Sequence, residues 1–387
     1  MTKQKKLTLL AIAIVLVSCN LRAPFTGVGS MVGLIQEDLG LSGSGAGMLT
    51  TIPLLAFAAV SPFVGTLCKK FGAGHVLLMS LLVLIAGIII RNFGGGMGLY
   101  IGTAVVGIGI AVGNVLPPAI IKVYFPEKLG LMTGLYSTFL SVGASIASGI
   151  SIPIAVAFGW KAALSVWLLL SVPTFLICLP NKDIQIADEG SSSGSSSHIY
   201  RSPLTWWITL YMGVQSLVFY GFAAWMASII QAKGFDSATA GLFVSAFMML
   251  GIPTSFIVPI FAGKMKNQSA LGALIGFGYT LGATILFLAD SIPMLILAIV
   301  CCAFSSGGSI SFIMAAFGLR TKNGEDASNL SGTAQCLGYL LAAIGPVFFG
   351  KIFDSTQSWI IPMLILIGCN AFLLVAGWVI GKDRVIE

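Results

Sequence analysis

Long uncharged apolar runs are the feature that most limits what this chain can fold into. A helix needs about 20 mainly apolar residues to cross the hydrocarbon core of a bilayer. Twelve such runs occur, at about 7–35, 44–67, 75–91, 98–121, 131–157, 161–179, 204–230, 238–262, 270–288, 292–317, 327–350 and 359–380. They do not alternate polar and apolar residues as barrel strands do. The sequence therefore predicts an all-α membrane protein with twelve transmembrane helices.

The composition excludes other classes. Charged residues make up 9% of the 387 residues and hydrophobic residues 57%, whereas an average soluble domain is about 25% charged. So few charges cannot cover the surface of a soluble domain. A soluble globular domain, a disordered chain and a disulfide scaffold are therefore excluded.

The basic residues predict the orientation. With a cytoplasmic N-terminus, 15 of the 20 Lys and Arg residues fall in cytoplasmic segments, and four (Arg91, Lys161, Lys233 and Lys351) fall in outer ones. This bias follows the positive-inside rule and indicates the cell (inner, cytoplasmic) membrane with both termini cytoplasmic. The basic residues are spread thinly over short segments, so no nucleic-acid partner is expected.

The longest polar stretch predicts the domain organisation. Residues 180–203 contain the run Gly-Ser-Ser-Ser-Gly-Ser-Ser-Ser at 190–197, which is typical of a flexible linker. We expect an N-terminal six-helix bundle over 1–179, a cytoplasmic linker over 180–203 and a C-terminal six-helix bundle over 204–387.

The two halves carry similar short runs at nearly constant offsets. Phe-Thr-Gly at 25–27 precedes Phe-Tyr-Gly at 219–221 by 194 residues (219 minus 25), and Met-Thr-Gly at 132–134 precedes Leu-Ser-Gly at 330–332 by 198 (330 minus 132). The pattern predicts two pseudo-symmetric bundles. Such repeats suit transporters that rock one half against the other around a central site.

Arg22 is the remaining basic residue, and it falls well inside a predicted span. An arginine at a helix centre costs about 2.5–3.5 kcal/mol to insert. All 13 acidic residues fall in loops or at span ends, and Glu37 is 15 positions further along the same predicted helix, roughly 22 Å away. We therefore expect Arg22 to bind a solute with negative or strongly polar oxygens. The alternative is a snorkelling or gate-forming arginine that binds backbone carbonyls.

Further polar residues inside spans are expected to line the same cavity. They are Asn20, Asn114, Tyr136, Gln215, Tyr220, Gln335 and Tyr339. Together they offer neutral donors and aromatic faces to a small, flat, polar solute. Each is also suited to an interhelical hydrogen bond.

Residues for catalysis or metal binding are not found in the predicted spans. His75 stands at a span end, His198 lies in the linker and no Asp or Glu lies within a span. The seven cysteines form no C-x-x-C motif, so we expect neither an enzyme, nor a metal, nor another cofactor. The expected partners are the lipid bilayer and a small-molecule solute, and the expected state is a monomer.

Several stretches resemble a known family. The loop Gly-Thr-Leu-Cys-Lys-Lys-Phe-Gly at 65–72 resembles the basic loop of the major facilitator superfamily, with Lys69 in place of the usual Asp. Leu-Thr-Thr-Ile-Pro-Leu-Leu-Ala-Phe at 49–57, Gly-Asn-Val-Leu-Pro at 113–117 and Leu-Ser-Gly-Thr-Ala-Gln at 330–335 resemble its cyanate and 2-nitroimidazole porter branch. The resemblance implies alternating access and a small solute such as cyanate, another small anion or a nitro-heteroaromatic.

The leading hypothesis is a secondary active or facilitative transporter of a small polar or anionic solute, with Arg22 in a central cavity between the halves. The first alternative is a broad-specificity drug exporter in which Arg22 is structural. The second is a membrane-embedded enzyme, and the third is a channel. The duplicated halves favour a transporter over an enzyme or a channel.

Overall fold

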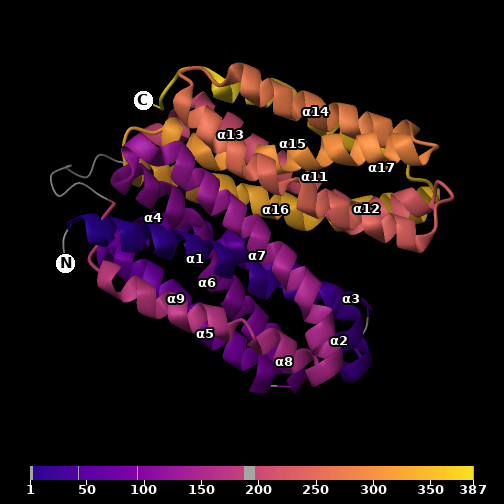
Figure 1. Ribbon diagram of the computed structural model, residues 1–387, viewed down its shortest axis with the longest axis horizontal. Helices are drawn as coiled ribbons and strands as arrows, with labels where there is room; N and C mark the ends of the chain where they lie inside the picture. The colour runs from indigo at the N-terminus through magenta and orange to yellow at the C-terminus, as the bar shows by residue number, and fades with distance from the viewer. Residues whose placement is uncertain (1–2, 42, 94, 187–196, 387) are drawn as a thin grey trace. The chain divides into compact units, whose positions relative to one another are not determined.

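The computed structural model describes residues 3–41, 43–93, 95–186 and 197–386. Within these ranges every regular element is a helix, and twelve helical segments are long and apolar enough to cross a membrane. The predicted all-α class and the predicted number of spans are therefore confirmed (Figure 1).

The internal contacts divide the chain into two units. Unit 1 comprises Met1–Glu127, Leu135–Ser195 and Asn323–Cys336, and unit 2 comprises Lys128–Gly134, Ser196–Lys322 and Leu337–Glu387. Two helices, α7 and α16, each begin in one unit and continue in the other. Most of the Gly/Ser run falls on 187–196, outside the described residues. The boundaries 1–179, 180–203 and 204–387 stay a prediction.

The first half of the chain forms the helices of unit 1. They are α1 (Lys3–Ser30), α2 (Val32–Leu39), α3 (Gly43–Val60), η1 (Ser61–Phe63), α4 (Val64–Phe71), α5 (Ala73–Phe93), α6 (Gly95–Tyr124), η2 (Pro126–Lys128), α7 (Leu129–Phe158), α8 (Trp160–Ser165), α9 (Leu168–Cys178) and η3 (Leu179–Asn181). Of these, η2 ends and α7 begins in unit 2.

The second half forms the helices of unit 2. They are α10 (Ser197–Arg201), α11 (Pro203–Gln231), α12 (Ser237–Leu250), α13 (Ile252–Lys264), α14 (Ser269–Leu288), α15 (Ile292–Leu319), α16 (Gly324–Thr356) and α17 (Ile360–Gly381). The first turns of α16 belong to unit 1.

The first span is shorter than the sequence predicted. Helix α1 ends at Ser30, Met31 forms a turn, and α2 begins at Val32, so the predicted continuation to residue 35 is wrong. Gly27, Gly29 and Ser30 precede the turn, and residues of this kind weaken a helix. Glu37 therefore lies on a separate helix from Arg22, and the distance argued from one continuous helix does not apply to this pair.

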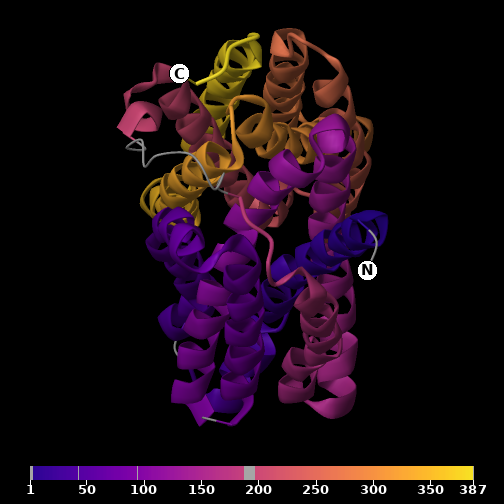
Figure 2. The ribbon, with the colours of Figure 1, turned by 90° about the vertical axis from the view of Figure 1, so that its left-hand side faces the viewer.

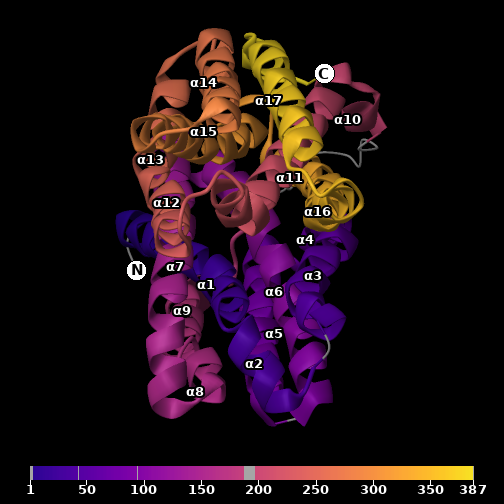
Figure 3. The ribbon, with the colours of Figure 1, turned by 90° about the vertical axis from the view of Figure 1, so that its right-hand side faces the viewer.

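The two units repeat one packing pattern, each within itself. The helices of unit 1 run from indigo to magenta in Figure 2. Within this unit, α6 packs against α5, α3 and α1, and α9 packs against α1 and α5. In unit 2, α15 packs against α14, α13 and α11, and α17 packs against α11 and α14 (Figure 3). Each partner in one unit has its counterpart at the same place in the other. The predicted pseudo-symmetry of the two bundles is thereby confirmed.

Close backbone approach holds α14 against α17. A Cβ placed on Gly272 would collide with the carbonyl oxygen of Gly377, and one placed on Gly377 would collide with that of Gly272. Two helices without side chains at this level can pack their backbones directly, as small residues allow within membranes. The two glycines are therefore required by packing.

A buried arginine closes the end of α17. Arg320 follows α15, and its Nε donates to the carbonyl of Ile380 at 2.8 Å and its Nη2 to that of Gly381 at 3.0 Å. Nη2 also donates to Gln268 Oε1. The last carbonyls of a helix lack intrahelical partners and carry partial negative charge, so this cation stabilises the helix end. Burial lowers the pKa of Arg320, and the nearby Asp383 carboxylate opposes that shift.

Replacing Gly272 with alanine should destabilise unit 2. The added methyl group has no room against the backbone of Gly377, and overpacking of this kind costs about 1–3 kcal/mol. Thermal unfolding of the purified protein in detergent measures the loss. Gly241→Ala is the matched control, because no atom lies within 4 Å of its added Cβ. An unchanged unfolding temperature in Gly272→Ala would contradict the packing argument.

Candidate solute-binding site

Arg22 lies half-buried in α1, two residues before Pro24. A proline has no N–H, so Pro24 leaves the carbonyl of Asn20, four residues earlier, without its helical partner. The hydroxyl of Thr26 donates to the Arg22 carbonyl at 3.0 Å. The first candidate residue thus stands where the regular bonding of α1 is interrupted.

Asn20 is buried and fully engaged in joining α1 to α9. Its Nδ2 donates to the Leu16 carbonyl and to Thr174 Oγ1, both at 2.9 Å. Its Oδ1 accepts a hydrogen bond from Ser171 Oγ at 2.6 Å. Both amide hydrogens are therefore used, and Asn20 can donate to a solute only by giving up one of these contacts.

Three predicted residues from three helices meet within unit 1. Tyr136 Oη of α7 donates to the backbone carbonyl of Asn114 in α6 at 3.4 Å, and Gln335 Nε2 of α16 donates to the same carbonyl at 3.1 Å. This carbonyl is available because Pro118, four residues later, has no N–H to offer it. The sequence identified these residues, but it pointed to the Asn114 side chain rather than to its main chain.

Gln335 retains one unused polar atom. Its Nε2 also donates to Ser331 Oγ at 2.8 Å. Its Oε1 is buried and has no hydrogen-bond partner among the described residues. A buried acceptor without a donor is costly, so this oxygen is suited to accept from a bound N–H or O–H group.

The remaining predicted residues lie in unit 2. Gln215 is buried in α11 and donates through Nε2 to Ser216 Oγ at 2.8 Å. Tyr220, also in α11, is half-buried, and Tyr339 is buried in α16. Gln335 and Tyr339 are four residues apart, but α16 passes from unit 1 to unit 2 between them. The structure therefore does not place all eight predicted residues in one unit.

A chain of aromatic rings runs from Tyr220 to Tyr279 through Phe219, Phe247 and Phe222, and the sequence did not predict it. The Phe219 ring centroid lies 5.2 Å from that of Tyr220 and 6.2 Å from that of Phe247. Phe222 lies 6.1 Å from Phe247 and 6.0 Å from Tyr279. The run Phe-Tyr-Gly-Phe at 219–222 was the available signal. Such rings offer flat apolar faces.

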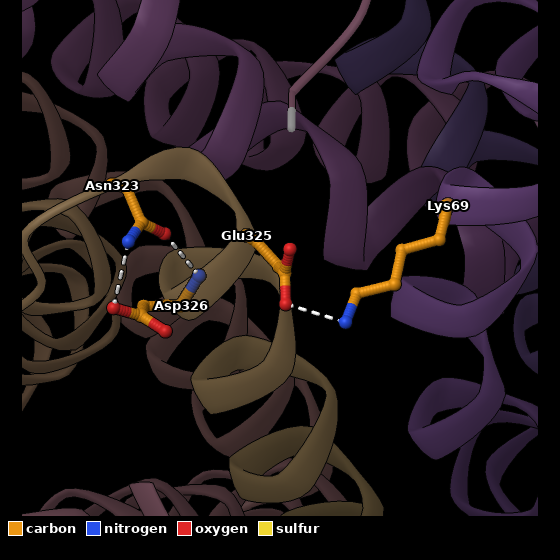
Figure 4. A network of polar contacts seen from close by, with 4 residues as sticks. All are labelled: Lys69, Asn323, Glu325 and Asp326. Carbon is orange, nitrogen blue, oxygen red and sulfur yellow. Dashed lines mark hydrogen bonds and ion pairs between the residues drawn. The ribbon is translucent and has the colours of Figure 1, made fainter. Parts of the chain in front are cut away.

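An ion pair joins the basic loop to the start of α16. Lys69 Nζ lies 2.6 Å from Glu325 Oε1, and both residues belong to unit 1 (Figure 4). Asn323 directly precedes the helix: its Oδ1 accepts from the Asp326 N–H at 2.8 Å, and its Nδ2 donates to Asp326 Oδ2 at 3.0 Å. Glu325 in the first turn also suits the positive end of the helix dipole. The lysine that replaces the usual Asp thus has an acidic partner.

Arg91 does not lie in an outer segment, where the count of basic residues placed it, but within the span Ala73–Phe93. It lies in the last turn of α5 and is buried. Its Nη1 donates to the Pro24 carbonyl of α1 at 2.9 Å. Nothing in the sequence signals this contact, because it joins residues 67 positions apart. Arg22 is therefore not the only arginine inside a span.

Comparison with known proteins identifies the family. The profile of the Major Facilitator Superfamily matches residues 10–346. The uncharacterized transporter YycB of Bacillus subtilis (strain 168) is 37% identical over 375 residues, which cover 96% of this chain and 93% of that protein. The 2-nitroimidazole transporter of Escherichia coli (strain K12) is 33% identical over 388 residues, which cover 99% of this chain and 98% of that protein.

A solved structure supports the same fold. The transporter FucP in the outward conformation superposes with a TM-score of 0.78 at 15% identity, covering 96% of this chain and 98% of that one. The chain belongs to the major facilitator superfamily. It is a multi-pass transmembrane transporter, and the predicted resemblance is confirmed.

The Lys69–Glu325 pair should contribute little to stability and should weaken with salt. Lys69 is 41% exposed and Glu325 22%, and pairs open to solvent contribute about 1 kcal/mol or less. A double-mutant cycle with Lys69→Ala and Glu325→Ala, followed by thermal unfolding at low and high salt, measures the coupling. Lys70→Ala is the neighbouring control. A coupling that salt leaves unchanged would contradict this interpretation.

Proposed function

We propose that this transporter moves a small, flat solute that carries polar oxygens, a nitro-heteroaromatic or a cyanate-like anion, by alternating access. The observation that carries the proposal is Arg22, a half-buried arginine in the interrupted region of α1. The 2-nitroimidazole transporter, similar over nearly the whole chain, supports this solute class.

Arg22 is the proposed contact for the oxygens of the solute. A guanidinium presents up to five N–H donors in a planar fork and stays charged at every physiological pH. Two parallel N–H groups match the two oxygens of a nitro group, and a single one suits the terminal oxygen of cyanate. Recognition by Arg22 therefore depends on the fork as well as on the charge.

Gln335 is the proposed contact for a ring N–H. Its Oε1 is buried and has no partner among the described residues, while its Nε2 is held by Ser331 Oγ and the Asn114 carbonyl. The two contacts of Nε2 fix the orientation of the amide. A 2-nitroimidazole carries a ring N–H from which this oxygen can accept a hydrogen bond, whereas cyanate carries none.

The other predicted residues have supporting roles in this proposal. Tyr136 and Asn114 position Gln335, and Asn20 holds α1 against α9 near Arg22. Gln215, Tyr220 and Tyr339 lie in unit 2, and their part in solute binding stays a prediction. We further propose a carrier without catalytic activity, in the cytoplasmic membrane, with both termini cytoplasmic.

Arg22→Ala and Arg22→Lys should both lose transport. A hydrogen bond to a charged group contributes about 1.5–3 kcal/mol, so transport efficiency should fall roughly ten- to 100-fold. Lysine keeps the charge but lacks the fork. Uptake of labelled 2-nitroimidazole and cyanate into proteoliposomes, at equal protein content, measures the change. Arg201→Lys, at an exposed position, is the control. Normal transport by both Arg22 variants would remove Arg22 from the mechanism.

Gln335→Leu should separate the two solutes. It removes the acceptor for a ring N–H, so 2-nitroimidazole transport should fall about tenfold, as the loss of one buried hydrogen bond implies. Cyanate transport should change by less than about twofold. Arg201→Lys, at an exposed position, is again the control and should transport both solutes normally. Equal losses for both solutes would assign Gln335 a structural role.

A broad-specificity drug exporter is the second candidate, and the chain of aromatic rings that includes Tyr220, Phe219 and Phe247 favours it. Such a protein would bind neutral apolar compounds and would use Arg22 only structurally. Competition separates the two candidates. Excess cyanate or nitrite should block transport in the first case and should leave drug efflux unchanged in the second.

A further inference from the structure

Arg91 is a second arginine inside a span, and its contacts do not involve Arg22. Arg91 is 1% exposed and lies at the end of α5. Its Nη1 donates to the Pro24 carbonyl. Its Nε and Nη2 are also buried, and neither has a hydrogen-bond partner among the described residues. The proposed transport step does not use this side chain.

The two unused donors lie on the same edge of the guanidinium. Nε–H and Nη2–H point in nearly the same direction, and this edge matches the two oxygens of a carboxylate or a nitrite ion. Nη1, which donates to the Pro24 carbonyl, does not belong to that edge. The contacts that the structure shows therefore leave the two-donor edge of the fork open.

The charge of Arg91 also lacks a protein counter-ion. In the described part of the chain, no carboxylate lies within ion-pairing distance of Arg91. The ion pair that the described residues do form joins Lys69 and Glu325 and does not involve Arg91. An arginine does not lose its proton in a protein. A buried charge without a partner is strongly unfavourable. A water molecule can accept the hydrogen bonds, but only an anion also neutralises the charge.

The neighbouring helix α6 packs closely against Arg91 and contributes a second polar group. A Cβ on Gly102 would lie 2.6 Å from Arg91 Cγ, so the glycine gives the arginine side chain room against α6. Thr103, the next residue, is buried, and its Oγ1 also has no partner among the described residues. An uncommitted hydroxyl thus lies on the helix that packs against α5.

We propose that the Nε/Nη2 edge of Arg91 binds one small planar anion with two oxygens, inside unit 1. Formate, nitrite and bicarbonate share this chemistry. The anion is either a resident counter-ion or the transported solute itself. The hydrogen bond from Arg91 Nη1 to the Pro24 carbonyl links this site to α1. The binding of the anion does not depend on Arg22.

Formate binding to purified full-length protein tests the proposal. Sodium formate and sodium nitrite should bind to the wild type and to Arg22→Ala, as isothermal titration measures, and sodium chloride should bind about tenfold more weakly. Arg91→Lys keeps the charge but loses the paired donors, so formate affinity should fall at least about tenfold. Arg201→Lys is the control and should bind formate normally.

Three results would overturn the proposal: no formate binding by Arg22→Ala, equal affinity for chloride and formate, or unchanged affinity in Arg91→Lys. If Arg91→Lys does not fold, solid-state NMR of the Arg22→Ala variant tests whether formate binds at Arg91. Magnetisation transfer between [13C]formate and a [15N]arginine side chain other than the exposed ones supports the site, and its absence overturns the site.

Transport of labelled formate identifies the source of the anion. Uptake into proteoliposomes that Arg91→Lys abolishes marks the bound anion as a transported solute. Binding without uptake marks it as a resident counter-ion. Both results support the site. A failure of the Arg22 mechanism leaves these results unaffected, because the binding measurements use Arg22→Ala.

Discussion

The structure depends on satisfying backbone carbonyls where prolines interrupt helices in lipid. Water cannot reach such groups in the hydrocarbon core, and each unsatisfied one costs several kcal/mol. Pro118 frees the Asn114 carbonyl, which Tyr136 and Gln335 satisfy. The interruption at Pro118 thereby becomes two bonds between helices. In unit 2, the Trp225 indole also donates to a backbone carbonyl beside a proline, that of Pro346 itself, at 2.8 Å.

This constraint explains why the candidate solute contacts are also packing contacts. Gln335 cannot offer its Oε1 to a solute unless its Nε2 is held, and the Asn114 carbonyl holds it. Asn20 is engaged entirely by α1 and α9. Loss of transport on changing such a residue therefore combines recognition with positioning. A comparison of two solutes that differ in one hydrogen bond separates the two effects.

The spans were predictable because about 20 consecutive apolar residues have few other uses in a protein. The repeat was predictable because the two halves keep similar short runs at similar spacing. The break of α1 at Met31 was not, since apolar composition continues through it. The burial of Arg91 was not predictable either, because a charge at a span end looks like a loop charge until its partner is known. Lys69 and Glu325 are 256 residues apart (325 minus 69), and sequence spacing gives no access to such a contact.

The duplication fixes packing more tightly than chemistry. The contacts of α6 and α15 follow the same pattern in their respective units. The offset of 194 residues that aligns 25–27 with 219–221, however, makes Ser216 the sequence equivalent of Arg22. Ser216 has no charge and accepts a hydrogen bond from Gln215. The aromatic residues Phe219 and Tyr220 follow it. Helix packing in lipid requires small residues and satisfied carbonyls, and both halves must keep them. Side chains that take no part in this packing were free to diverge, so Arg22 has no charged counterpart in unit 2, and the ring pair of Phe219 and Tyr220 is found there instead.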